Sequence, residues 1–192
     1  MVTIGIVIFP NVEELDFVAP FEVLSYANKV QPNSTKVLLI APSLEPVHAF
    51  NGLRILPDVT FENCPTLDIL LFPGGKGRMT WMKETSMQNF IQKHSKEVTY
   101  LTSVCTGAFF FAEAGMLMGK EVTTYYTAFD ELAAYGVNVV SSKVVRDGKI
   151  ITAAGVSSGL ELGFYLLREL FGAPLAQEVA ERIEYTIDIM HL

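Results

Sequence analysis

The sequence predicts an α/β fold in which a mostly parallel β-sheet is covered by helices on both faces. Short apolar runs rich in β-branched residues alternate along the chain with longer segments whose apolar residues recur at helical spacing. Strands buried on both faces have continuous apolar runs, and their alternation with helices implies βαβ crossovers. The length of 192 residues is typical of one domain with a large core, so we expect residues 1–192 to form a single domain.

The first half of the chain contains three buried-strand patterns. They cover residues 3–9 (TIGIVIF), 36–42 (KVLLIAP) and 67–75 (LDILLFPGG), and the last of them enters a glycine-rich loop. Residues 16–30 have apolar positions at helical spacing and predict a helix after the first strand. Between the second and third strands, Asn51-Gly52 predicts a hairpin with a type I′ turn.

The second half continues the alternation of strands and helices, with Asp147-Gly148 as a second hairpin turn. The predicted elements are a polar surface helix over 79–95, a strand over 98–105, an apolar helix over 106–117, a strand over 121–126, an amphipathic helix over 128–136, and two closing helices over 156–171 and 174–188.

Composition argues against several classes of protein. The net charge is −7 and there is no run of Lys or Arg, so we expect no nucleic-acid partner. The apolar stretches are far shorter than the roughly 20 residues of a membrane span, and no signal peptide precedes the first strand. Cys64 and Cys105 make no disulfide framework. These features predict a soluble cytoplasmic protein without membrane contact.

Chemically notable residues follow three of the predicted strands. Asp16 follows the first strand, Gly74 and Gly75 follow the third, and Cys105 follows the fourth. The carboxyl ends of parallel strands meet at one edge of a sheet, where α/β proteins place their sites. A helix N-terminus favours a thiolate, so this position predicts a pKa for Cys105 below that of a free thiol. The alternative interpretation is that Cys105 is a small apolar packing residue.

Four segments together resemble the ThiJ/PfpI superfamily over nearly the whole chain: FPNVEELDFVAPFEVL, ILLFPGGKG, SVCTGAFFFAEAGML and EVTTYY. The resemblance implies a flavodoxin-like three-layer sandwich with a cysteine at a strand–helix elbow. By motif position it makes Cys105 the nucleophile and Asp16 the nearby carboxylate, and it places the backbone of Gly74 and Gly75 along the site. It also implies a homodimer.

Within this superfamily the chain is most similar to isocyanide (isonitrile) hydratases, through LDFVAPFEV, VCTGAFFFAEAGML and VVRDGKIITAAGVSSG. In those enzymes Asp faces the cysteine and Thr follows it, as Thr106 does here. The same signatures occur in the sensor domains of some AraC-family regulators. Protease-like members have His after the cysteine, which this chain lacks. Both similar groups usually have Thr-Thr-His where this chain has Thr123-Thr124-Tyr125, so Tyr125 is expected to alter the substrate pocket.

The resemblance implies a hydro-lyase that converts a small isonitrile into an N-substituted formamide through a thioimidate on Cys105. Asp16 would supply the proton, Thr106 a hydrogen bond, and Gly74, Gly75 and Tyr125 the contacts with substrate. No metal or organic cofactor is expected. The alternatives are an oxidant- or electrophile-sensing stress protein, and a glyoxalase or deglycase acting on 2-oxoaldehydes.

Several single residues have a second interpretation. Asp16 is also a favoured N-cap residue for the helix it begins. Thr106 is either a hydrogen-bond donor or a plain helix-start residue, and Trp81 either covers the pocket or packs. Glu13 and Glu14 are interpreted as exposed loop charges.

Overall fold

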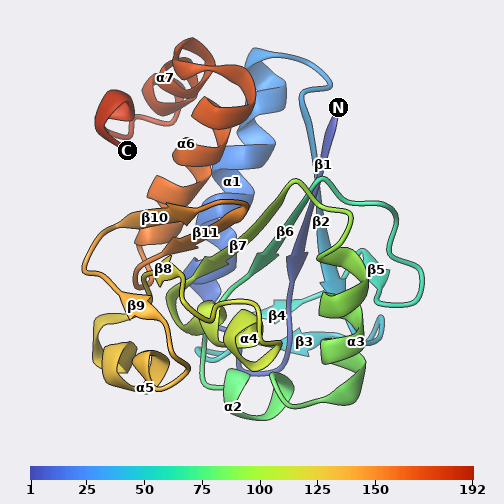
Figure 1. The fold of residues 1–192 in the computed structure, drawn as a ribbon. Coiled ribbons are helices and arrows are strands. Elements are labelled where there is room, and N and C mark those ends of the chain that lie inside the picture. The colour runs from blue at the N-terminus through green and yellow to red at the C-terminus, as the bar shows by residue number, and fades with distance from the viewer.

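A central sheet of seven strands organises the computed structural model, which describes residues 1–192 (Figure 1). The strand order is β10-β11-β7-β6-β1-β2-β5, and only β10 runs antiparallel to its neighbour. The predicted α/β class with a mostly parallel sheet is confirmed. The seven strands are β1 (Val2–Val7), β2 (Thr35–Ala41), β5 (Val59–Thr60), β6 (Ile69–Phe72), β7 (Tyr100–Val104), β10 (Val144–Asp147) and β11 (Ile150–Ala153).

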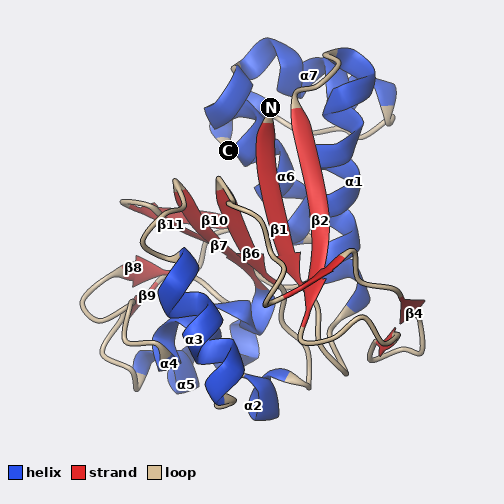
Figure 2. Cartoon of the chain, turned by 90° about the vertical axis from the view of Figure 1, so that its right-hand side faces the viewer, coloured by secondary structure: helices blue, strands red, loops and turns tan.

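Helices cover both faces of this sheet, giving three layers (Figure 1 and Figure 2). One group packs together on one side: α1 (Glu14–Val30), α6 (Ser158–Phe171) and α7 (Ala173–Arg182). The other side carries α2 (Arg78–Trp81), α3 (Thr85–His94), α4 (Ala108–Glu113) and α5 (Phe129–Ala133). Every residue of β6 is buried, as the continuous apolar run predicts for a strand covered on both faces.

Short elements complete the chain outside the main sheet. They are the antiparallel pair β3 (Val47–His48) and β4 (Arg54–Ile55), the parallel pair β8 (Glu121–Val122) and β9 (Asn138–Val139), and the 3₁₀ turns Cys105–Gly107, Tyr126–Ala128 and Ile189–His191. The β3–β4 pair projects from the end of the sheet (Figure 2).

Several predicted elements are shorter or more divided in the structure. The helix expected over 128–136 spans Phe129–Ala133, and the one expected over 174–188 ends at Arg182. The helix expected over 79–95 is two helices, α2 and α3, and the helix expected over 106–117 begins as a 3₁₀ turn and ends at Glu113. The strand expected over 121–126 ends at Val122. Beyond it the backbone N–H of Thr123 bonds to the Thr152 hydroxyl instead of a neighbouring strand, so the ladder stops there.

Both predicted hairpins form, but each turn differs from its prediction. In the first, Gly52 has a φ of 101° whereas Asn51 does not take a positive φ, and a type I′ turn requires both. In the second, the register pairs Asp147 with Ile150, so the two turn residues are Gly148 and Lys149, one position later than predicted. Gly148 has a φ of 64°, the conformation that a two-residue turn needs at its first position.

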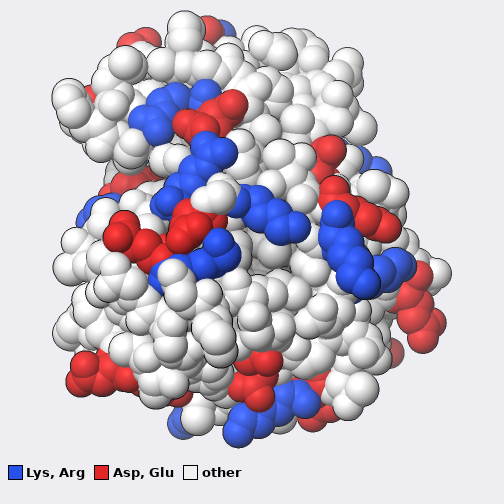
Figure 3. Space-filling view, in the orientation of Figure 1, with Lys and Arg blue, Asp and Glu red and all other residues white.

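Charged side chains of both signs are interspersed on the face shown in Figure 3. Two ion pairs involve residues of β10: Arg146 with Glu169 at 2.5 Å, and Asp147 with Lys120 at 2.9 Å. No helix of the fold combines the length and the apolarity needed to cross a bilayer.

One titratable side chain lies in the core without a polar partner. His94, expected on a surface helix, is 1% exposed, and neither ring nitrogen makes a hydrogen bond. Its ring packs on Phe90 at 4.4 Å between centroids. Burial lowers the pKa of His94, because the charged imidazolium loses its hydration there, and the charge of Lys93 adds to this.

We therefore predict that His94→Phe raises the stability of the protein relative to wild type at low pH. In the unfolded chain this histidine takes up a proton below about pH 6.5, whereas in the folded protein its lowered pKa keeps it neutral. The free energy of unfolding therefore decreases as pH falls below about 6.5. Urea unfolding at pH 8 and pH 5 measures the difference. His48→Phe is the control, because His48 is exposed and makes no ion pair. A His94→Phe effect that is the same at both pH values would contradict the prediction.

Candidate active site

Cys105 lies at a sharp elbow between β7 and the apolar helix α4, as predicted. Its φ is 58°, in the left-handed region that residues with side chains rarely adopt. The Cys105 N–H donates to the Ala154 carbonyl at 2.8 Å, and the Thr124 hydroxyl donates to the Cys105 carbonyl at 2.7 Å. The phenyl rings of residues 109–111 are fully buried behind the elbow. These bonds and this packing hold the strained conformation, with the cysteine only 6% exposed.

Asp16 lies in the first turn of α1 and is completely buried. The Gly74 N–H donates to Asp16 Oδ2 at 2.8 Å, whereas Oδ1 has no protein hydrogen-bond partner. The N-cap position belongs to Glu13, and Asp16 accepts its bond from another segment of the chain. The N-cap interpretation of Asp16 is therefore wrong, and its carboxyl group belongs to the site around Cys105.

Gly74 allows two side chains to approach the end of β6. A Cβ atom there would lie 2.5 Å from Thr106 Oγ1 and 3.0 Å from Asp16 Oδ2. Gly74 is buried behind these groups and does not line the pocket, so its predicted contact with substrate is replaced by a supporting contact with Asp16. The adjacent Gly75 N–H donates to Thr106 Oγ1 at 3.2 Å. Thr106 therefore joins the elbow to the glycine loop and is more than a helix-start residue.

The Asp16 carboxyl group and the Cys105 thiol affect each other's protonation. Burial raises the pKa of Asp16 to about 7, and the charge of Glu13 acts in the same direction. The hydrogen bond from Gly74 and the neighbouring Cys105 thiol act in the opposite direction. Burial, followed by the charge of Asp16, raises the pKa of Cys105 to about 12, although N–H groups of Thr106 and Val156 act in the opposite direction.

The predicted acidic thiol is therefore wrong. Only a short 3₁₀ turn begins at Cys105, and loss of hydration together with the neighbouring carboxylate outweighs the backbone N–H groups. Asp16 is the first member of the pair to ionise. Above pH 7 the pair consists of a carboxylate next to a protonated thiol, which is an arrangement for moving one proton between sulfur and a carboxyl oxygen.

A pocket of about 390 Å³ opens onto the sulfur. Four predicted site residues line it: Gly75, Cys105, Thr106 and Tyr125. The sequence analysis missed five others, Glu13, Lys76, Arg78, Met79 and Val156.

Two of the missed residues contribute backbone strain or charge. Val156 has a φ of 39°, although it is β-branched, and its N–H group interacts with the Cys105 sulfur. Nothing in the local sequence pattern indicates such a conformation. The Arg78 guanidinium binds both carboxylate oxygens of Glu131, at 3.0 and 2.6 Å, and lies 3.8 Å over the Phe109 ring. Glu131 therefore balances the charge of Arg78, whose side chain forms part of the pocket wall.

The two glutamates before Asp16 are not simple exposed charges. Glu13 lines the pocket, and burial together with the charge of Glu14 raises its pKa. Glu14 accepts bonds from the Asn51 backbone N–H and side-chain amide, both at 2.7 Å. These hydrogen bonds connect the β3–β4 hairpin to the start of α1.

The remaining candidates lie away from the pocket. None of His48, His94 and His191 lines it, and Trp81 packs against the core instead of covering the sulfur. Cys64 is half-buried, and burial raises its pKa to about 11. No three His, Cys, Asp or Glu side chains form a group able to hold a metal ion.

Comparison with known proteins finds a matching family, similar proteins and similar structures. A model of the DJ-1/PfpI family matches residues 2–169. Isonitrile hydratase from Pseudomonas putida is 38% identical over 182 residues, which are 95% of this chain and 78% of that protein. A crystal structure of a ThiJ/PfpI family protein from Pseudomonas syringae matches with a TM-score of 0.88 and 31% identity, covering 97% of this chain and 76% of the other. Drosophila melanogaster DJ-1beta shares the fold, with a TM-score of 0.87 and 22% identity over 97% of this chain and 99% of that chain.

We predict that Asp16→Asn stabilises the protein at pH 8 but not at pH 4. A buried carboxyl with a raised pKa stays protonated in the folded state while the unfolded chain ionises, so stability falls as pH rises from about 4 to about 7. A difference of roughly three pKa units corresponds to at most about 4 kcal/mol. Urea unfolding at both pH values measures the gain, with the exposed Glu62→Gln as control. Equal effects of Asp16→Asn at the two pH values would contradict the buried-carboxyl assignment.

We also predict that Cys105 titrates above the free-thiol value of about 8.5. Removing the Asp16 charge lowers the cost of forming the thiolate, so Asp16→Asn should lower this pKa. Thiolate ultraviolet absorbance against pH, in a Cys64→Ser background, measures the shift, and the additional Cys105→Ser variant supplies the baseline. A Cys105 pKa below that of a free thiol in the wild-type protein would contradict the prediction. It would mean that the thiol ionises first and that Asp16 holds the proton of the pair.

Proposed function

The chain belongs to the DJ-1/PfpI family, and we propose that within it the protein is an isonitrile hydratase-like enzyme that converts R–N≡C into an N-substituted formamide. The observation that carries this proposal is the buried Asp16 carboxyl group behind Cys105, whose sulfur opens onto a pocket that no histidine lines. The reaction needs a soft nucleophile for the terminal carbon and an acid that protonates the same carbon. The 38% identity with the Pseudomonas putida isonitrile hydratase supports the same chemistry.

In the first half-reaction the Asp16 carboxylate acts as a base and then as an acid. It takes the thiol proton while the Cys105 sulfur forms a bond to the terminal isonitrile carbon. Asp16 then gives that proton to the same carbon. The product is a thioimidate, R–N=CH–S–Cys105, and Asp16 is again a carboxylate. The thiol need not be ionised beforehand, so a raised Cys105 pKa is compatible with this sequence.

In the second half-reaction Asp16 activates water. The carboxylate accepts one proton from water as the hydroxyl adds to the thioimidate carbon, and it passes this proton to the nitrogen. The adduct R–NH–CH(OH)–S–Cys105 then collapses. The carbon–sulfur bond breaks, the sulfur recovers a proton from the hydroxyl group, and R–NH–CHO is released.

Groups around the sulfur have supporting roles in this proposal. The Thr106 and Val156 N–H groups stabilise negative charge on the sulfur when it leaves. Thr106 Oγ1 accepts a bond from Gly75, so its own hydroxyl proton is available for the imidate nitrogen. Tyr125 closes one side of the pocket with a ring that cannot act as a histidine-like base.

We predict that the purified protein hydrates para-nitrophenyl isocyanide to its formamide. Cys105→Ala should abolish turnover, because no other thiol lines the pocket, and Cys64→Ala is the matched control. Asp16→Asn should lower turnover steeply, since the amide cannot exchange a proton in this way. Thr106→Val should cost about one hydrogen bond, roughly tenfold in rate.

The pH profile tests the assignment of Asp16. The reactive form has an ionised Asp16 and a protonated Cys105, so kcat/KM should rise as pH increases through about 7. A profile that falls over this range would assign the reaction to the protonated carboxyl group. Consumption of methylglyoxal that depends on Cys105, without isonitrile turnover, would replace the proposal with a glyoxalase. Oxidation of Cys105 with neither activity would favour a sensor.

A further inference from the structure

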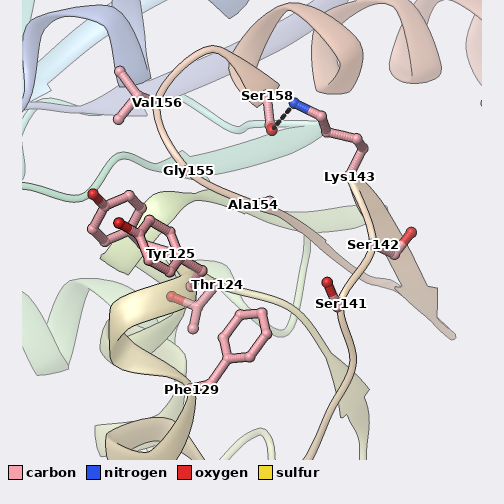
Figure 4. Close-up of a pocket in the computed structure, with 11 residues that line it drawn as sticks. Thr124, Tyr125, Phe129, Ser141, Ser142, Lys143, Ala154, Gly155, Val156 and Ser158 are labelled. Carbon is pink, nitrogen blue, oxygen red and sulfur yellow. Dashed lines mark hydrogen bonds between the residues drawn. The ribbon is translucent and has the colours of Figure 1, made fainter.

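A second hollow lies next to the Cys105 pocket, on the far side of Tyr125. Its volume is about 460 Å³, and it shares Tyr125 and Val156 with the pocket that opens onto the sulfur. Thr124, which also lines it, donates its hydroxyl to the Cys105 carbonyl at 2.7 Å. Figure 4 shows the residues around this second hollow. The two hollows are therefore adjacent and have Tyr125 and Val156 between them.

The Tyr125 ring lines both hollows and packs against the edge of the core. It lies against Gly155, where a Cβ atom would be only 2.4 Å from Tyr125 Cδ2. Its other ring contact is an edge-on one with Tyr126, at 4.8 Å between centroids, and Tyr126 is 70% exposed. The wall between the hollows is therefore the half-buried Tyr125 ring, which lies next to the exposed Tyr126.

The second hollow has an aromatic part and a cationic part. Tyr126 and Phe129 line it from the segment that follows β8. In Figure 4, Lys143 and Ser158 lie at the end opposite to Phe129. Lys143 is the only cationic residue that lines it. The aromatic side chains favour a flat apolar group, and the ammonium favours an anion at the other end of that group.

The contacts of Lys143 leave room for an anionic ligand. Its Nζ donates to Ser158 Oγ at 3.5 Å and lies 3.8 Å from the Glu161 carboxylate, both long contacts. An ammonium carries three N–H donors, so one is not used by these contacts. Ser158 is also the first residue of α6, a helix of 14 residues whose N-terminus adds partial positive charge.

We propose that this second hollow holds the organic group of the isonitrile and selects an aromatic group that carries a carboxylate. The proposal rests on the proposed hydratase function. The isonitrile carbon lies at Cys105, the aromatic ring passes Tyr125 to contact Tyr126 and Phe129, and the carboxylate binds Lys143 and the Ser158 hydroxyl. A neutral aromatic group makes the ring contacts but leaves the ammonium without its ligand.

Two isonitriles that differ by one carboxylate test the selection. The measurement is the ratio of kcat/KM for para-isocyanobenzoate to that for phenyl isocyanide, in wild type and in Lys143→Gln. Loss of one charge-assisted hydrogen bond should lower this ratio about tenfold. Lys36→Gln, which changes an exposed lysine of β2, should leave the ratio as it is in wild type. Turnover of both isonitriles with a ratio insensitive to Lys143 would overturn the subsite and leave the hydratase proposal intact.

A binding measurement separates failure of the subsite from failure of the reaction. Calorimetry with the Cys105→Ala protein compares para-formamidobenzoate, the expected product, with formanilide, which lacks the carboxylate. We expect the carboxylated ligand to bind about tenfold more tightly, and Lys143→Gln to remove that advantage. Lys143-dependent binding without isonitrile turnover would retain the subsite and reject the hydratase. Equal binding of the two ligands would reject the subsite.

Discussion

The Asp16 carboxyl group is completely removed from solvent and lies next to the Cys105 thiol, and the segments around it are arranged to make that burial possible. A buried carboxylate is costly unless it is hydrogen-bonded, and only one protein N–H group, that of Gly74, reaches it. Gly74 must also lack a side chain for Asp16 and Thr106 to fit. The contact between Gly74 and Asp16 therefore fixes how three segments meet: the end of β6, the first turn of α1 and the elbow after β7. Its electrostatic consequence is a carboxyl group that changes its charge near neutral pH.

Backbone strain accompanies this contact on two adjacent strands. β7 and β11 are paired, and just beyond their carboxyl ends Cys105 and Val156 both have positive φ angles, 58° and 39°. Such conformations persist only where the surrounding structure fixes them. The buried phenyl rings of α4 and the bond from Cys105 to Ala154 provide that rigidity. The strain aims the sulfur into the pocket and brings the Val156 N–H group to it.

The fold by itself leaves the reaction open, because a protein only 22% identical, Drosophila DJ-1beta, shares it. What the site adds is a thiol whose buried neighbour is a carboxyl group rather than a histidine. Such a pair moves a proton between sulfur and a neighbouring carbon without requiring a stable thiolate. Tyr125 then determines the shape of the space beyond the sulfur, since it forms the wall between two hollows. Chemistry and selectivity therefore depend on different residues.

The sequence by itself determined the α/β class, the places of the main strands along the chain and the positions of Asp16, Gly75 and Cys105 at one edge of the sheet, because buried strands and helices have distinct apolar periods. It also predicted that Cys105 lies at a strand–helix elbow. Only the tertiary structure decided the protonation of the pair, since burial and a charge brought from another segment control a pKa. Val156 and Glu13 were missed for the same reason: a strained φ and a pocket-facing carboxylate arise from packing between distant segments, which local sequence patterns do not encode.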